Sequence, residues 1–408
     1  MLEIKDKKNC CGCAACAQIC PKRCISMEAD QEGFYYPIVE KRNCINCGRC
    51  KAVCPFLKKG ECLEVLNAYG GYSKDAEVRE TSSSGGIFSL LASYMILSGG
   101  VVFGISMSDD CKSAYYREVQ DIKDLKYLQG SKYLQAEPGD TYIKVKKYLE
   151  AGKKVLFTGT VCQINGLRLY LGKAYSQLYC MDVICHGVPS ARLWKKYVNH
   201  IEKKYKAKLR NINFRCKGKK SVNVKMNKAD NKFQYIYIPK DEDPYMQMFL
   251  KNYCLRLSCY ECFAKSKKLA DITVGDLWGA EKIVSELNDG KGMSFIIVRT
   301  QKGQELFNVI KKDIIFEEVS YQEGVRYNPS EYSSVSRPAQ RCTFFLDMDV
   351  LSFKRLQKKY IPTSIKRNIK KWMKSFVLSR TCSSKKGAKV QKNEDYGLMF
   401  TFTRVNNK

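Results

Sequence analysis

Hydrophobic and polar positions in residues 65–340 follow two alternating patterns. Short runs rich in β-branched and aromatic residues have the composition of β-strands. These predicted strands are 67–73, 100–106, 154–157, 178–183, 211–216, 222–226, 233–238, 272–274 and 295–300. Segments with apolar residues three and four positions apart predict helices at 85–97 and 141–150, around Leu167 and from Ser190. The alternation predicts a mixed α/β domain with functional loops at strand ends, as in open α/β sheets.

The C-terminal part of the chain has a different pattern. Between Lys354 and Lys392 there are fourteen Lys or Arg and no Asp or Glu. Apolar residues recur there at helical spacing, at Ile365, Ile369, Trp372 and Phe376. We therefore predict a basic helical, amphipathic tail over 341–408 that is disordered from Cys382 onward. Two interpretations stay open. The apolar face can pack on the protein's own domain, or residues 354–380 can lie on an anionic membrane surface.

Length and composition are those of a globular enzyme. At 408 residues, 45% of them hydrophobic, the chain is long enough for two or three domains with a core. The longest apolar run, 87–97, is interrupted by serine and is too short to cross a bilayer. We therefore expect a cytoplasmic protein, or one held peripherally at the inner face of the membrane.

The formal net charge of +30 favours anionic partners. We expect an acidic redox protein as partner, with an anionic membrane surface as the further possibility that the tail raises. Nucleic acid is the least supported partner, because the sequence contains no recognition motif and its aromatic residues do not interleave with a basic stripe.

Eight cysteines near the N-terminus carry the clearest chemical signal. They form two runs with the spacing C-x2-C-x2-C-x3-C-P, namely Cys10, Cys13, Cys16 and Cys20, then Cys44, Cys47, Cys50 and Cys54. This spacing is that of bacterial iron–sulfur ligation, in which the fourth cysteine of each run binds the other cluster. On that rule Cys54 completes the first 4Fe–4S cluster and Cys20 completes the second. The sequence predicts an α+β ferredoxin-like two-cluster module over 1–62, and electron transfer with it.

Zinc and disulfide bonds are the alternatives for these cysteines. Zinc sites usually pair two C-x2-C knuckles or add histidine, whereas this chain has 2 histidines and each run ends in C-P. Disulfides need an oxidising compartment, and the short charged stretch before Cys10 does not have the pattern of a signal peptide. The 21 cysteines instead suggest a reducing, anaerobic cytosol.

A second set of cysteines follows predicted strands or forms a C-x2-C pair. It comprises Cys162, Cys185, Cys259 and Cys262. Three loops that deliver four thiols can close a third cluster. From spacing alone, a single C-x2-C pair can also bind zinc, form a redox dithiol or have no function. Most of the other nine are expected to be small apolar fillers or thiols without a ligand role: Cys11, Cys24, Cys62, Cys111, Cys180, Cys216, Cys254, Cys342 and Cys382.

Six segments, in order, resemble the coenzyme F420 hydrogenase/dehydrogenase beta-subunit family, and the resemblance covers about residues 1–300. They are SSSGGIF at 82–88, GSKY at 130–133, VLFTGTVCQ at 155–163, DVICHGVP at 182–189, RLSCYEC at 256–262 and DITVGDLWG at 271–279. Members of this family are iron–sulfur flavoproteins. The resemblance therefore implies an FAD in the central domain, 65–340, beside a cluster ligated by the second cysteine set. The chain departs from the family at Val161, where proline is usual.

Each candidate flavin contact also has a structural interpretation. The candidates are Ser83, Ser84, Gly85, Gly86, Lys132, Gly159, Thr160, His186 and Asp276. The serine–glycine segment opens a helix whose N–H groups can hold a phosphate, or it is an ordinary serine cap. Lys132 can face the phosphates or the flavin ring, or it is solvated. His186 can donate to cluster sulfur or to the flavin, and Asp276 can contact cofactor, or both have structural roles.

Two functions follow from these features. The favoured one is a flavoprotein oxidoreductase that passes electrons between ferredoxin-type clusters and a flavin, with hydride transfer to or from a deazaflavin or another small or sugar-linked substrate. The resemblance extends to family members associated with bacterial polysaccharide biosynthesis, which a basic tail on a membrane face would suit. The alternative is an electron-transfer subunit without its own substrate site. The strand-rich insertion at 209–238 and the surplus positive charge would suit docking on a catalytic partner.

Overall fold

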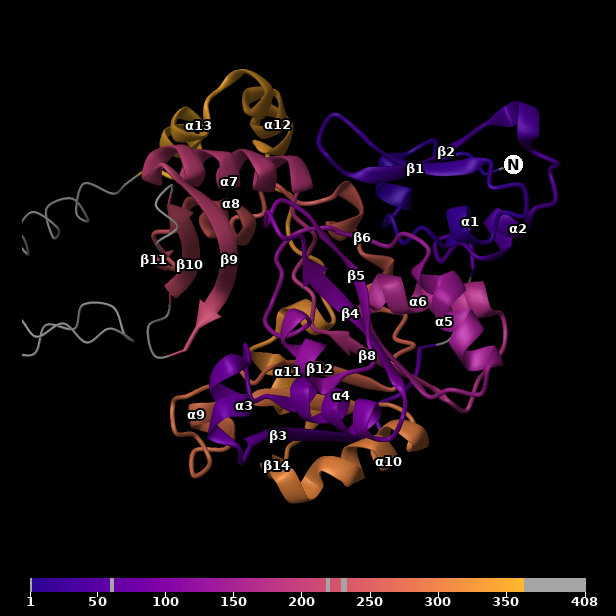
Figure 1. Cartoon of the computed structure of the whole chain (residues 1–408), viewed down its shortest axis with the longest axis vertical. Coiled ribbons are helices and arrows are strands. Elements are labelled where there is room, and N and C mark those ends of the chain that lie inside the picture. The colour runs from indigo at the N-terminus through magenta and orange to yellow at the C-terminus, as the bar shows by residue number, and fades with distance from the viewer. Residues whose placement is uncertain (1, 59–61, 218–220, 229–232, 363–408) are drawn as a thin grey trace, which may run out of the picture.

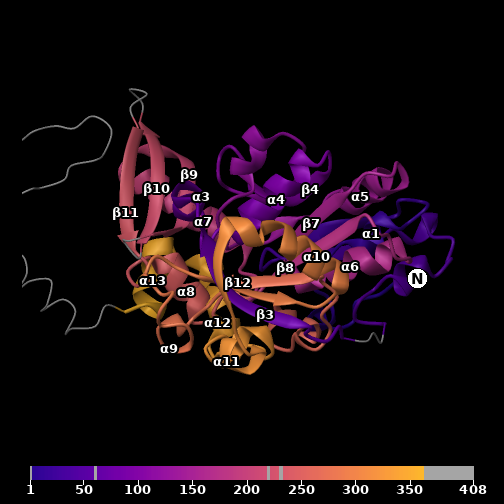
Figure 2. The ribbon, with the colours of Figure 1, turned by 90° about the horizontal axis from the view of Figure 1, so that it is seen from below.

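A computed structural model describes residues 2–58, 62–217, 221–228 and 233–362. A small N-terminal module lies at one end, a large sheet covered by helices lies in the middle, and a three-stranded sheet lies at the other end (Figures 1 and 2). The predicted amphipathic helix after Pro362 and the segment from Cys382 lie outside the described residues. Among the residues described, no helix combines the length and the apolar character needed to cross a membrane.

The N-terminal module consists of two similar halves, which accords with the predicted α+β organisation. Its elements are α1 (Ala15–Gln18), β1 (Ile25–Ala29), β2 (Tyr35–Val39) and α2 (Arg49–Ala52), and β1 pairs antiparallel with β2. Each short helix begins after a residue in the left-handed region, Ala14 at φ 60° and Gly48 at φ 75°. Each helix also contains the third cysteine of its run, so the two motifs have the same local backbone.

The central sheet has nine strands in the order β14-β3-β13-β12-β8-β7-β4-β5-β6. Their bounds are β3 (Asn67–Ser73), β4 (Val101–Met107), β5 (Ala114–Val119), β6 (Ala136–Glu137), β7 (Val155–Thr160), β8 (Leu178–Val183), β12 (Ile272–Asp276), β13 (Ser294–Val298) and β14 (Ile314–Glu318). The strands β12, β8, β7 and β4 run parallel, and β13, β3 and β14 extend the sheet antiparallel on one side. The carboxyl ends of the parallel strands therefore meet at one edge, which is where such sheets place their sites.

Helices cover both faces of this sheet, and buried residues on its strands alternate between two apolar clusters. On one face, α4 (Ile87–Leu97) and α10 (Gln301–Ile310) pack over residues such as Leu156 and Met181. On the other face, α5 (Thr141–Glu150) and α6 (Val161–Leu171) pack over Phe157 and Leu178. The second cluster also contains Cys13, Ala15 and Val53. The N-terminal module is thus joined to the central domain through shared core.

The third part is an antiparallel sheet packed on helices. Its strands are β9 (Ala207–Cys216), β10 (Ser221–Lys228) and β11 (Phe233–Pro239), in the order β11-β10-β9. The helices with residues in the same core cluster are α7 (Ala191–Tyr205), α8 (Pro244–Leu250), α12 (Arg341–Val350) and α13 (Phe353–Tyr360). The remaining helices are α3 (Ala76–Thr81), α9 (Ala280–Ile283) and α11 (Tyr321–Arg326).

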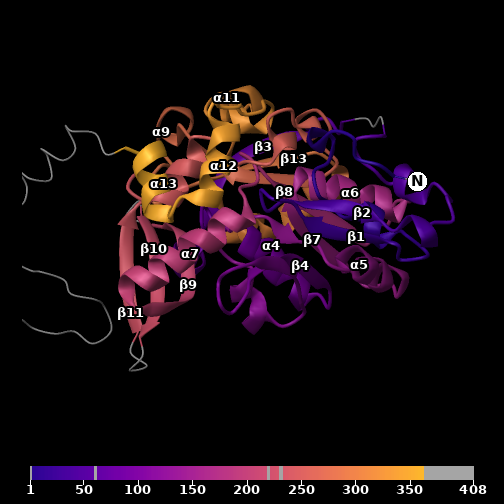
Figure 3. The same cartoon turned by 90° about the horizontal axis from the view of Figure 1, so that it is seen from above.

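Helices α12 and α13 change the predicted boundary of the tail. The sequence assigned everything from residue 341 to a basic tail, but Phe344, Met348, Leu356 and Tyr360 are buried in the core of the third part. Figure 3 shows the two helices lying against α7. The first part of the segment predicted to contact a membrane, 354–360, therefore packs on the protein's own domain. Its apolar positions are used by that packing.

Candidate iron–sulfur and cofactor sites

The fourth cysteine of the first run lies with the first three of the second run. A small enclosed cavity is lined by Cys20 together with Cys44, Cys47 and Cys50. Pro21 and Gly48 line the same cavity. This is the grouping that the crossed ligation rule predicts for the second cluster. Cys24 is also on the lining, and its Sγ lies 3.4 Å from that of Cys20.

The other crossed group brings Cys54 to the first run. Burial, with negative charge on Cys10 and Cys54 acting in the same direction, raises the pKa of the Cys16 thiol to about 12. Burial likewise raises the pKa of Cys54, with Cys10 among the additional causes. Cys13 is buried against α6, where a Cβ added to Gly166 would lie 3.0 Å from the Cys13 Sγ. This group therefore lies at the junction with the central domain.

A cleft with a cavity volume of about 460 Å³ opens at the carboxyl ends of β7, β8 and β12. This is within the range of about 300–1,000 Å³ that ligand pockets usually have. Ten residues singled out in the sequence lie on its lining: Ser83, Ser84, Gly86, Lys132, Gly159, Thr160, Cys162, Cys185, His186 and Asp276. Gly85 is not on the lining, because its N–H donates to Ser294 Oγ at 2.8 Å and its Cα lies against the Gly71 backbone. The candidate cofactor residues are thus gathered in one place, apart from Gly85.

The second cysteine set converges beside this cleft. Cys162 lies in the first turn of α6, Cys185 follows β8, and Cys259 and Cys262 lie in the loop after α8. Burial raises the pKa of Cys185 to about 12, and the charges of Cys162 and Cys262 act in the same direction. Burial also raises the pKa of Cys259, with further contributions from Cys185, Cys262 and Cys162. Four partly buried thiols that influence one another's pKa values in this way are the type and number of donors that a 4Fe–4S cube requires.

Hydrogen-bond donors lie at this thiol set. The backbone N–H of Val188 donates to Cys259 Sγ at 3.4 Å, and the Thr160 hydroxyl lies 3.2 Å from Cys162 Sγ. Lys265 Nζ donates to the Cys185 carbonyl at 2.5 Å. Within the described ranges, no three His, Cys, Asp or Glu side chains gather closely enough to hold a single metal ion. A 4Fe–4S cube is larger than one ion and keeps its four ligand sulfurs further apart.

The polar residues of the cleft divide into those that hold the fold and those that face the cavity. Ser84 Oγ donates to the Met293 carbonyl at 2.8 Å. Ser83 Oγ accepts hydrogen bonds from the Ser131 N–H and hydroxyl at 2.8 and 3.0 Å. No side chain caps α4, whose N-cap is Gly86 at φ 92°. The N-terminal end of this 11-residue helix is therefore left to backbone N–H groups, the arrangement that binds anions.

Lys132, His186 and Asp276 each have a protein partner. Lys132 Nζ donates to the Gln129 carbonyl at 2.6 Å, and burial lowers the pKa of this lysine to about 7. His186 Nε2 lies 2.7 Å from Asn252 Oδ1, and burial lowers the pKa of the imidazole. The Asp276 carboxylate accepts hydrogen bonds from both Nη groups of Arg215 in a bidentate ion pair. Lys132 is thus neither a solvated lysine nor one with a carboxylate partner.

The cleft also contains residues that no motif indicated. Arg215 and Lys240 come from or follow strands of the three-stranded sheet, and Trp278 is 48% exposed with its ring 5.5 Å from the Arg215 guanidinium carbon. Cys11, which the sequence analysis placed among the fillers, lines the cleft, and the pKa of its thiol is raised chiefly by Cys13, while Cys162 acts in the opposite direction. The sequence signal for Cys11 was its position inside the first cysteine run.

Comparisons with known proteins match this arrangement in two segments. Residues 152–323 match the family model for the C terminus of the coenzyme F420 hydrogenase/dehydrogenase beta subunit, and residues 9–57 match that of the 4Fe–4S dicluster domain. The coenzyme F420-dependent sulfite reductase of Methanocaldococcus jannaschii is 23% identical over 336 residues, which are 78% of this chain. The match spans 48% of that relative, so the chain covers about half of its length.

A solved structure is also similar, at a low level. It is a xenon derivative of the F420-reducing [NiFe] hydrogenase complex from Methanosarcina barkeri, with 15% identity and a TM-score of 0.42. The similarity covers 79% of this chain and 96% of that one. The fold and the two family matches together define an iron–sulfur protein of an oxidoreductase class. Residues 152–323 belong to the coenzyme F420 hydrogenase/dehydrogenase beta-subunit family, and residues 9–57 form an N-terminal 4Fe–4S domain.

Proposed function

We propose that this chain is an iron–sulfur flavoprotein oxidoreductase. Electrons pass between the two clusters of the N-terminal module and a flavin in the cleft, by way of a third 4Fe–4S cluster held by the second cysteine set. One observation carries the proposal: the cleft is lined by Cys162 and Cys185 of the second set and by the candidate cofactor residues, and also by Cys11, which lies between Cys10 and Cys13 of the first run. Cluster ligands and cofactor contacts therefore share one cavity.

The residues of the cleft fit a phosphate-bearing flavin such as FAD. The open N-terminus of α4 and the buried Lys132 would bind phosphate, and the apolar and aromatic lining, including Phe249 and Trp278, would hold a ring system. A bound flavin accepts electrons singly and exchanges them in pairs as hydride. The contribution of this chain is to hold and orient that group, and to keep the ligand sulfurs of the third cluster beside it.

The substrate proposed first is a deazaflavin. The family description and the printed name of the Methanocaldococcus relative both refer to coenzyme F420. A sugar-linked substrate of polysaccharide biosynthesis is the second possibility and rests on the resemblance alone. The net charge of +30 supports an acidic redox protein as the partner. An anionic membrane surface is the second partner proposed, because Lys354, Arg355, Lys358 and Lys359 keep their charged side chains exposed.

A carrier without its own substrate site is the second candidate function. The observation in its favour is the formal net charge of +30, which suits docking on an acidic catalytic partner. In that case the partner supplies the substrate site. A bound flavin in the purified protein favours the enzyme, whereas a flavin-free protein with full iron favours the carrier.

Anaerobic purification with iron, sulfide and flavin analysis tests the proposal. Three 4Fe–4S clusters predict about twelve irons and one flavin per chain. Cys162→Ser should lose about four irons and keep the signals of the other two clusters. Cys342→Ser is the matched control, since Cys342 is exposed and belongs to none of the three groups. About eight irons in the unmodified protein, with no change in Cys162→Ser, would remove the third cluster.

A further inference from the structure

Arg256 has a buried guanidinium that extends from the second cysteine set to the first cysteine run. It precedes Cys259 by three residues and is 1% exposed. Its backbone N–H donates to the Val188 carbonyl at 2.9 Å. The N–H of Val188 in turn donates to Cys259 Sγ. The backbone of Arg256 therefore belongs to one candidate cluster site.

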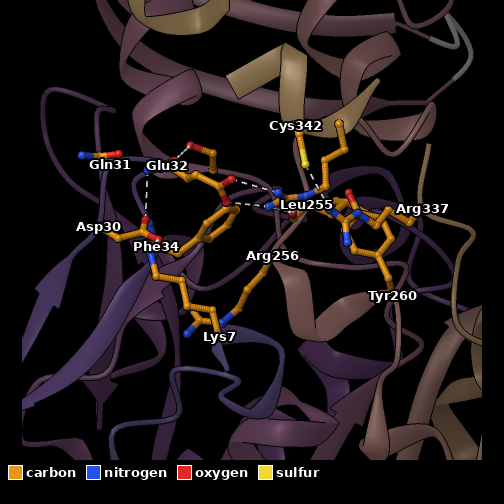
Figure 4. A network of polar contacts seen from close by, with 12 residues as sticks. Lys7, Asp30, Gln31, Glu32, Phe34, Leu255, Arg256, Tyr260, Arg337 and Cys342 are labelled. Atoms are coloured by element: carbon orange, nitrogen blue, oxygen red, sulfur yellow. Dashed lines mark hydrogen bonds and ion pairs between the residues drawn. The ribbon is translucent and has the colours of Figure 1, made fainter. Parts of the chain in front are cut away.

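The side chain of Arg256 reaches the other candidate cluster site. Nε donates to the Cys10 carbonyl at 2.7 Å, and Nη2 donates to the Tyr35 carbonyl at 2.9 Å and to Cys10 Sγ at 3.6 Å. The ring of Tyr36 lies under the guanidinium, 4.1 Å from its central carbon. Figure 4 shows Arg256 near Phe34, apart from the contacts that surround Glu32. Three donors are thus directed at the first cysteine run and the β1–β2 hairpin.

Arg256 has no carboxylate partner among the residues that the structure describes. None of the ion pairs found in the described part of the chain includes it, and its buried Nη1 has no hydrogen-bond acceptor. The neighbouring buried guanidinium of Arg341, in contrast, is paired with Glu32. A buried cation without a counter-ion is strongly unfavourable. An anionic group must therefore face this side chain in the functional protein.

The unpartnered Nη1 lies at the boundary between the first cysteine run and the cleft. A Cβ added to Gly12 would be 3.0 Å from Nη1, and Gly12 has φ +71°, so this position requires glycine. Gly12 and Cys11 both line the cleft. Electrostatic interactions link the guanidinium to Cys10 on one side and to Cys162 and Cys259 on the other. Arg256 is therefore the cation shared by both thiol groups.

We propose that Arg256 is a positioning residue for electron transfer, which raises the reduction potentials of the Cys10 cluster and of the third cluster together. The inference rests on the proposed function for its third-cluster part. A 2+ core with four thiolates has a net charge of 2−, and reduction adds one more negative charge. A fixed positive charge and N–H donors to sulfur favour the reduced form. One electron leaves one cluster and enters the other, no bond changes, and Arg256 stays charged throughout.

Redox titration of the anaerobically purified full chain, followed by electron paramagnetic resonance, tests this role. Arg256→Gln should shift the reduction equilibrium of two clusters by about tenfold, or about 59 mV for a one-electron couple, toward the oxidised form. Arg256→Lys keeps the charge but loses the fork of donors, so its shift should be smaller. The matched control is the double substitution Arg341→Gln with Glu32→Gln, which removes a neighbouring buried guanidinium together with its counter-ion and should leave all potentials unchanged. Unchanged potentials in iron-loaded Arg256→Gln, or an equal shift in the control, would overturn the inference.

A second measurement uses the unmodified protein, in case Arg256→Gln does not assemble its clusters. Protein labelled with 15N in arginine should show nitrogen hyperfine coupling to the reduced Cys10 cluster, because Nη2 lies 3.6 Å from the Cys10 Sγ. If every reduced cluster lacks such coupling, the inference fails. Failure of the proposed function is distinguishable from this result. An iron content of about eight per chain would show that the third cluster is absent. A shift confined to the Cys10 cluster would then still establish the role of Arg256 at that cluster.

Discussion

The guanidinium of Arg341 forms two hydrogen bonds with the carboxylate of Glu32, at 2.9 and 2.6 Å, although 309 positions separate the two residues. Glu32 lies in the turn between β1 and β2, and Arg341 begins α12. Arg341 also donates to the Leu255 carbonyl at 3.0 and 2.8 Å. The C-terminal helices therefore fasten the N-terminal module to the loop that contains Cys259.

Glu32→Gln should lower the free energy of unfolding by about 3 kcal/mol, because it leaves the buried Arg341 without its counter-ion. Anaerobic urea denaturation would measure the change. Asp349→Asn is the control, since it breaks the ion pair of Asp349 with Arg192, whose side chains are 42% and 45% exposed. Exposed pairs contribute about 0–1 kcal/mol. Equal effects of the two substitutions would contradict a special role for the Glu32 pair.

Cys24 is positioned to replace Cys20 as a ligand of the second cluster. The two Sγ atoms lie 3.4 Å apart, and both line the cavity formed by the second cysteine run. We expect Cys24→Ser to keep full iron and Cys20→Ser to keep part of the second cluster. The double substitution should lose about four irons. Iron analysis of the three variants measures this, and a complete loss of the second cluster in Cys20→Ser alone would refute the replacement.

The sequence predicted the parts of the fold that local pattern determines. Strand β8 and helix α5 have the predicted bounds, because an apolar run and an amphipathic period each end at turn residues. Strands β5 and β14 were not predicted. The first contains Tyr115, Tyr116 and Arg117, and the second ends in two glutamates, so neither has a strong apolar pattern. They lie near or at opposite edges of the sheet, where pairing with a neighbour decides the structure.

The candidate site also divides into residues that local sequence pattern predicted and residues that only tertiary contacts reveal. Cysteine spacing identified the two N-terminal groups, and the motifs that follow β7, β8 and β12 supplied most of the cleft. Arg215 could not be assigned in this way, because it reaches Asp276 from a separate sheet, 61 positions away. In the sequence, Arg256 stood out only as the first residue of the RLSCYEC segment at 256–262. Its meaning comes from contacts with Cys10 and Tyr35, which only the tertiary structure supplies.

Asp276→Asn distinguishes a structural role of Asp276 from direct contact with the cofactor. The carboxylate is already engaged by both Nη groups of Arg215. We therefore expect the variant to keep its flavin and to bind pyrophosphate, used as an anionic probe, more tightly, because Arg215 loses its counter-ion. Binding at two salt concentrations should show that the gain is electrostatic. Loss of flavin with iron retained would instead indicate that Asp276 itself contacts the cofactor.

Lys132 should give the protein a pH-dependent stability that its removal abolishes. Burial lowers the pKa of Lys132 to about 7 in the folded state, whereas an unfolded lysine has a pKa of about 10.4. Between these values the unfolded chain binds more protons, so the free-energy cost of burying the Lys132 ammonium group grows as the pH falls from about 10.4 to about 7 and is constant below that. Lys132→Met should therefore stabilise flavin-free protein more at pH 6 than at pH 9. Anaerobic thermal unfolding would measure this. Reconstitution with flavin should reduce the difference between the two pH values if a phosphate faces the Lys132 ammonium group. Equal stabilisation by Lys132→Met at both pH values in flavin-free protein would contradict the burial of the Lys132 charge.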